Sequence, residues 1–225
     1  MSFLSRVLAI LWKDVRAEFR TKEMMSSMLI FALLVVVIFS FALDPADPQV
    51  RRAFPGILWV AFFFAGVLGL NRSFTSEKQG DCLQGLMLSP VDRSAIYFGK
   101  VAGNLVFMTA MEAITLPVFL IFYDYPVGGV GWRLVLVIVA STLGFVAVGT
   151  FLAALAANTR TSEILLPIIL FPIVVPIVLA AVQSTGALLE GRVSVDVSVW
   201  LKVLAAYDTL FLVVPFLLFE YLLEV

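Results

Sequence analysis

Few side chains in this sequence could do chemistry. The 225 residues contain no histidine and a single cysteine, Cys82, which excludes the usual zinc sites, a histidine-based catalytic triad and an intrachain disulfide. The Gly99-Lys100 pair is followed by Val101, whereas a phosphate-binding loop needs Ser or Thr there and a glycine five residues before the first of the pair. We therefore predict no catalytic residue and no metal site in this chain, and it is not expected to be an ATPase.

Two carboxyl groups, Glu112 and Asp208, stand inside long apolar runs. A charged side chain at the centre of a bilayer costs about 2.5 to 3.5 kcal/mol on the insertion scale, so such groups rarely face lipid. They could be polar points on a transport pathway or at a subunit seam. They could instead fasten helices, either neutral or hydrogen-bonded to neighbours such as Asn104, Thr109 or Thr209. We favour fastening, because neither carboxylate has an obvious cationic partner. Asn104 and Lys100 are expected to snorkel towards the membrane surface.

The elements that position these residues are membrane-spanning helices. Apolar residues make up 62% of the chain, charged residues only 14%, and the mean hydropathy is +1.07. At about 20 apolar residues per span, the sequence accommodates about six helices and no separate soluble domain. We predict an all-α polytopic fold in a single permease-like domain, residues 1–225, with spans at about 24–43, 53–70, 97–122, 134–157, 164–182 and 199–219.

Residues 1–23, which precede the first span, have apolar side chains at helical spacing and basic side chains largely elsewhere around the helix. This leader is predicted to be an amphipathic helix in the membrane interface. Placing the N-terminus in the cytoplasm puts ten of the fifteen Lys and Arg residues on the cytoplasmic side. The positive-inside rule therefore predicts a multi-pass protein with both termini in the cytoplasm.

The fifth span contains three prolines, Pro167, Pro172 and Pro176. Each proline removes a helical hydrogen bond, so this span should be kinked.

The segment FTSEKQGDCLQGLMLSP, residues 74–90, lies within the predicted cytoplasmic connection 71–96. Leu83, Leu86 and Met87 recur at helical spacing, and Ser89-Pro90 would end a helix. The segment could be a short amphipathic helix along the membrane surface or a solvated loop with one interfacial turn; periodicity alone leaves both open.

The order SEKQGDCLQGLMLSPVDRSAIYFGK, with a basic amphipathic leader before six spans, resembles the coupling region of ABC-2-type transporter permeases. The preceding FPGILWVAFFFAGVLGLNRSF is similar to the haem exporter protein B family of cytochrome c maturation permeases. The resemblance implies that a coupling helix docks on a separate ATPase subunit, through Phe74, Glu77, Leu83, Gln84, Leu86, Met87 and Pro90. Gly80-Asp81 and Gln84 depart from the usual family pattern of acidic residues and change the charges of this element.

The resemblance also implies the remaining partners and the location. ATP would be bound by the ATPase partner on the cytoplasmic face, and haem would be handled by the complex, through a haem-handling membrane subunit and a haem chaperone, with no cofactor assigned to this chain. A second permease copy or a similar subunit would complete the transporter in the bacterial inner membrane. ATP hydrolysis would drive haem export or release of the haem-loaded chaperone. The alternatives are an ABC-2 permease for another substrate, or a secondary transporter or channel that works without an ATPase.

Overall fold

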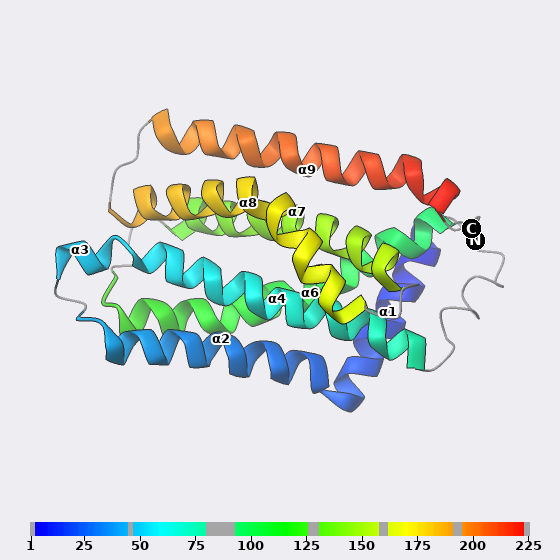
Figure 1. Cartoon of the computed structure of the whole chain (residues 1–225), viewed down its shortest axis with the longest axis horizontal. Helices are drawn as coiled ribbons and strands as arrows, with labels where there is room; N and C mark the ends of the chain where they lie inside the picture. The colour runs from blue at the N-terminus through cyan, green and yellow to red at the C-terminus, as the bar shows by residue number, and fades with distance from the viewer. Residues whose placement is uncertain are drawn as a thin grey trace.

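The computed structural model describes residues 3–44, 47–79, 93–125, 131–157, 162–190 and 195–222. Six long helices run roughly along one axis (Figure 1): α2 (Glu23–Ala42), α4 (Phe54–Gln79), α6 (Arg93–Phe122), α7 (Gly131–Ala157), α8 (Ser162–Leu189) and α9 (Val195–Leu222). The leader forms α1 (Phe3–Thr21), which crosses one end of the bundle, and the short α3 (Pro48–Arg51) lies at the other. We call these the α1 end and the α3 end.

All six long helices are long and apolar enough to cross a membrane. The shortest, α2, has 20 residues, which at about 1.5 Å per residue matches a hydrocarbon core of about 30 Å. The described ranges contain helices and no strand. The predicted all-α polytopic fold, with six spans after an amphipathic helix, is therefore confirmed.

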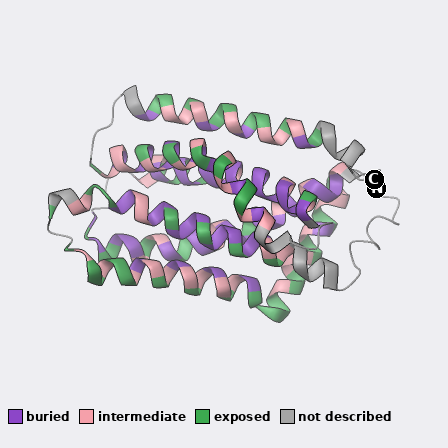
Figure 2. Ribbon diagram, viewed as in Figure 1, coloured by how far each residue is buried: buried purple, intermediate pink, exposed green. Residues whose placement is uncertain are grey.

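Helices α4 and α7 form the centre of the bundle. Buried side chains make up 67% of the apolar window of each, against 22% for α2 and 17% for α9. Figure 2 shows the same gradient, with buried residues concentrated on the central helices and exposed ones along α2 and α9. An exposed apolar helix face in this chain is compatible with lipid contact and needs no further partner to explain it.

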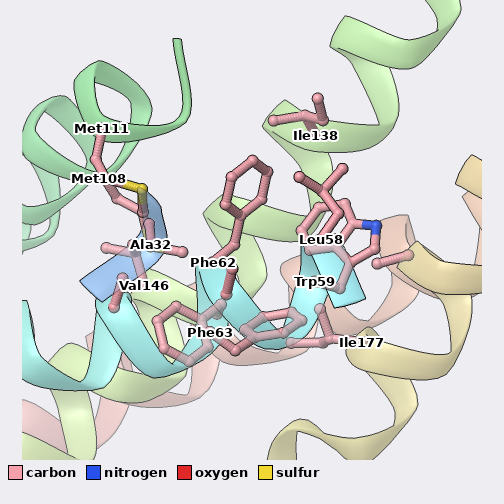
Figure 3. Close-up of a cluster of buried hydrophobic side chains, with 14 of the residues drawn as sticks. Ala32, Leu58, Trp59, Phe62, Phe63, Met108, Met111, Ile138, Val146 and Ile177 are labelled. Carbon is pink, nitrogen blue, oxygen red and sulfur yellow. The ribbon is translucent and has the colours of Figure 1, made fainter. Parts of the chain in front are cut away.

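The centre is packed by aromatic and small side chains together. Trp59, Phe62 and Phe63 of α4 lie in one cluster with side chains from α6, α7 and α8 (Figure 3), and the Phe63 ring centroid is 4.8 Å from that of Phe145 on α7. At Gly149 of α7, a Cβ atom would overlap the Leu70 side chain of α4. Lipid tails are as apolar as leucine, so association between spans depends on such close packing.

Most of the long helices extend beyond the predicted spans, and α4 and α6 do so on the two sides of the predicted connection 71–96. α4 continues past Leu70 to Gln79, and α6 begins at Arg93 rather than Tyr97. The connection between them thus comprises residues 80–92, which is shorter than the predicted 71–96. No Gly or Pro occurs between Leu70 and Gly80, so nothing in that stretch ends the helix, whereas hydropathy marks only where the membrane ends.

A break separates α1 from α2. Lys22 adopts a left-handed backbone conformation, with φ 57°, between the last residue of α1 and the first of α2. That conformation is sterically uncommon for a residue with a side chain and cannot continue a right-handed helix. It lets the chain turn from the crossing direction of α1 into the direction of the spans.

Candidate functional site: the α1 end and the polar groups of the core

The predicted docking residues lie at and beyond the last turns of α4. Phe74 and Glu77 belong to α4, although their side chains are outside what the structure describes. Leu83, Gln84, Leu86, Met87 and Pro90 fall within 80–92, outside the described residues. The coupling helix therefore stays a prediction. The structure does describe the two helices that flank it and what holds them in place.

The first turns of α6 are fastened to α1. Lys100 Nζ lies 2.9 Å from the Asp14 carboxylate, and the Lys100 side chain is only 3% exposed. At Gly99 a Cβ atom would come within 2.8 Å of Ile10 on α1, so only glycine permits this approach. Lys100 does not snorkel as predicted; it is buried because a carboxylate from the leader reaches it. Pairing of this kind is what makes a buried ammonium tolerable.

The start of α2 is also tied to its neighbours. Glu18 of α1 accepts a 2.8 Å hydrogen bond from the backbone N–H of Met25, one of the orphan donors in the first turn of α2. Arg72 of α4 pairs with Glu23 at 2.8 Å, but both side chains are more than half exposed, and such pairs contribute little to stability. A cleft of about 180 Å³ lies among these groups, lined by residues of α1, α2, α4 and α6.

Deeper in the bundle, polar side chains join α6 to α7. The Thr142 hydroxyl donates a 2.7 Å hydrogen bond to Glu112 Oε1, and both residues are buried. About two turns towards the α1 end, Asn104 donates to the Thr150 hydroxyl at 3.0 Å. Asn104 is thus buried and bonded rather than snorkelling. These contacts support the fastening interpretation of Glu112.

The predicted bonding partners of the carboxyl groups were wrong. The Thr109 hydroxyl donates to the Leu105 carbonyl, and that of Thr209 donates to the Ala205 carbonyl, each one turn back on its own helix. A threonine satisfied by its own backbone offers no donor to a neighbouring helix. Thr142 could have been suspected from the sequence only as one of several hydroxyls in the fourth span.

Asp208 is buried on α9, facing α7. Its carboxylate lies against the backbone of α7 at Gly144, where a Cβ atom would overlap it. Within the described part of the chain, Asp208 Oδ1, Glu112 Oε2 and the Ser141 hydroxyl have no hydrogen-bond partner. Gly144 and Thr142 are two positions apart, so Asp208 and Glu112 contact opposite sides of α7. The fold keeps these two carboxyl groups apart, and they do not form a dyad.

The three prolines of the fifth span lie inside α8, which remains one helix from Ser162 to Leu189. Figure 1 shows α8 changing direction along its length. Tyr207 of α9 donates a hydrogen bond to the Ile173 carbonyl, which is next to the Pro172 carbonyl that Pro176 leaves without its helical N–H donor. A neighbouring helix thus supplies a donor close to the point where the backbone ladder is interrupted. Pro117 in α6 and Pro215 in α9 also lie within helices; the sequence reasoning had not singled them out.

Among the residues that the structure describes, no group of three or more His, Cys, Asp or Glu side chains could hold a metal ion. The site thus consists of the helices that frame residues 80–92 and a set of interhelical polar contacts. These contacts hold the helices in register.

Comparison with known proteins points to one family. Residues 5–221 match the family model described as CcmB protein. The chain is 24% identical to heme exporter protein B of Pseudomonas aeruginosa over 90% of this chain and 91% of the relative. It is 26% identical to heme exporter protein B of Rhodobacter capsulatus over 81% and 84% of the two chains. With the Escherichia coli K12 protein of that name it shares 32% identity over 40% and 41%. With a family model matched over nearly its whole length, the chain belongs to the CcmB protein family, as its resemblance to haem exporter protein B predicted.

Proposed function

We propose that the chain is the membrane permease subunit of an ABC transporter for cytochrome c maturation. In this proposal a separate ATPase subunit binds and hydrolyses ATP at the α1 end, which faces the cytoplasm. The hydrolysis drives haem export or the release of a haem-loaded chaperone. The observation that carries the proposal is the family match over residues 5–221, together with six spans in the described structure.

The geometry of the α1 end supports a coupling role for the connection between α4 and α6. Both helices are long and continuous, α4 to Gln79 and α6 from Arg93, so a force applied to residues 80–92 would act on two rigid elements. The buried Lys100–Asp14 pair fixes α1 to α6. In the proposed mechanism, closure of the ATPase moves the loop, and α6 carries α1 with it.

In this proposal, haem is bound by other subunits of the complex and not by this chain. This chain has no histidine, and its one cysteine is Cys82, so any axial ligand from this chain would have to be Met, Tyr or Cys82. We propose that a haem-handling membrane subunit and a haem chaperone bind haem. A second permease copy or a similar subunit would complete the assembly in the bacterial inner membrane.

Co-purification tests this proposal. Full-length tagged chain is extracted from its own membranes in mild detergent with added lipid, and the eluate is assayed for ATP hydrolysis and for its subunits. We expect an ATPase subunit to be retained, and cells lacking the chain to lose haem attachment to c-type cytochromes. An eluate without ATPase, under conditions that preserve other membrane complexes, would overturn the proposal. Retained ATPase with normal cytochrome c would instead favour an ABC-2 permease for another substrate.

A further inference from the structure

Helix α1 carries an apolar stripe that does not pack on the bundle. Leu4, Leu8 and Trp12 are spaced by four residues, Phe19 continues the same face, and their exposed fractions are 66%, 53%, 66% and 76%. Ile10, by contrast, is buried against α6 at Gly99. Because α1 crosses the end of the bundle (Figure 1), the stripe runs across the direction of the spans. A helix of this kind is suited to lie in the plane of a membrane interface.

The fold sorts the charges of α1 by sign. Both acidic residues are engaged within the protein: Asp14 pairs with Lys100, and Glu18 accepts the Met25 N–H. Arg16 and Arg20, one helical turn apart, are exposed on the outer surface. Lys13 is also exposed, although it contacts Asp14 at 3.2 Å. In the linear sequence acids and bases alternate along the leader, but in the folded protein the outward surface of α1 is basic.

We propose that this outward surface of α1, the apolar stripe and the Arg16–Arg20 edge beside it, binds anionic phospholipids in preference to zwitterionic ones, because their headgroups carry a net negative charge. The stripe supplies contact with acyl chains, and the guanidinium groups supply attraction to negative headgroups. Arginine suits this role because its planar donors match phosphate oxygens. The proposal concerns lipid alone and stands whether or not the chain couples to an ATPase.

Lipid competition tests the proposal on the full-length protein. Purified chain in detergent micelles is exposed to equal amounts of phosphatidylglycerol and phosphatidylcholine, and native mass spectrometry counts the lipids retained. We expect preferential retention of phosphatidylglycerol. A basic side chain near an anionic surface is worth about fivefold in binding, so Arg16→Gln with Arg20→Gln should lower the preference roughly 25-fold at low salt. The difference should shrink as salt is added.

Two further variants locate the effect. Arg52→Gln with Arg133→Gln removes the same charge from the α3 end and should leave the preference unchanged. Trp12→Ala should reduce retention of both lipids while keeping their ratio, since the stripe contributes apolar contact. An unchanged ratio in the Arg16 and Arg20 variant would overturn the proposal. So would an equal fall in the Arg52 and Arg133 variant, because the preference would then reflect net charge and not α1.

Discussion

Asp14→Asn isolates the contribution of the buried ion pair that joins α1 to α6. The change leaves the Lys100 ammonium, whose side chain is 3% exposed, without its carboxylate 2.9 Å away. Removing one partner of a buried pair typically costs 3 to 5 kcal/mol. Asp14 is itself 13% exposed, so we expect the lower end, about 3 kcal/mol. For a chain of this length that corresponds to a fall of about 6 to 12 °C in unfolding temperature.

The assay is thermal unfolding of the purified full-length protein in detergent, followed by intrinsic fluorescence and by the monodisperse fraction after heating. Glu23→Gln is the matched control, since it makes the same carboxylate-to-amide change in a pair whose members are 65% and 55% exposed, and it should shift stability by less than about 1 kcal/mol. Adding Lys100→Met to Asp14→Asn should recover most of the loss, because the buried ammonium is then removed together with the carboxylate that faces it. If Asp14→Asn were no more destabilising than Glu23→Gln, the fastening of α1 to α6 by this pair would be refuted.

Three further predictions concern the core and the α3 end. Glu112→Gln keeps an oxygen that can accept the hydrogen bond from Thr142, so it should change the unfolding temperature little, whereas Glu112→Leu removes that hydrogen bond and should cost about 1 kcal/mol of stability. Equal effects of the two variants in thermal unfolding would contradict the interpretation that Glu112 fastens α6 to α7. Gly144→Val should destabilise the protein by more than about 1 kcal/mol, because the new side chain would overlap Asp208 on α9. Gly56→Val is the control, since a Cβ atom there meets nothing within 4 Å, and the unfolding temperatures of the two variants are compared. Burial raises the pKa of Tyr123 from 10.0 to about 12, so the unfolded chain loses this proton first as pH rises, and stability falls between about pH 10 and 12. The unfolding temperature of Tyr123→Phe should lack that part of the decline, and a pH profile identical to that of the unaltered protein would contradict this prediction.

Much of the fold follows from the sequence because the bilayer imposes it. A run such as Met24–Leu43 has no charged residue and the length of one span, and backbone groups in lipid must bond within a helix. Helix ends are different. Asn71–Gln79 is polar, so hydropathy assigns it to a loop, yet it continues α4 because it contains neither Gly nor Pro.

The site was less accessible to sequence reasoning because its contacts are long-range. Nothing local to Lys100 indicates that its partner is Asp14. Similarly, which of several hydroxyls bonds Glu112 depends on the rotation of α7 about its axis. The leader was recognisable as amphipathic, but the contacts of Asp14 with α6 and of Glu18 with α2 are known only once α1 is packed against those helices.

We propose that an ATPase acts on this chain through residues 80–92. ATP hydrolysis by the co-purified complex is the direct test of this proposal. Leu83→Glu and Leu86→Glu are compared with Val127→Glu and Val130→Glu, which also replace an aliphatic side chain by a carboxylate, but in the connection between α6 and α7. We expect the first pair to lose ATP hydrolysis stimulated by the permease, or to lose the ATPase subunit altogether, and the second pair to retain both. Undiminished hydrolysis in a complex carrying both Leu83→Glu and Leu86→Glu would contradict it.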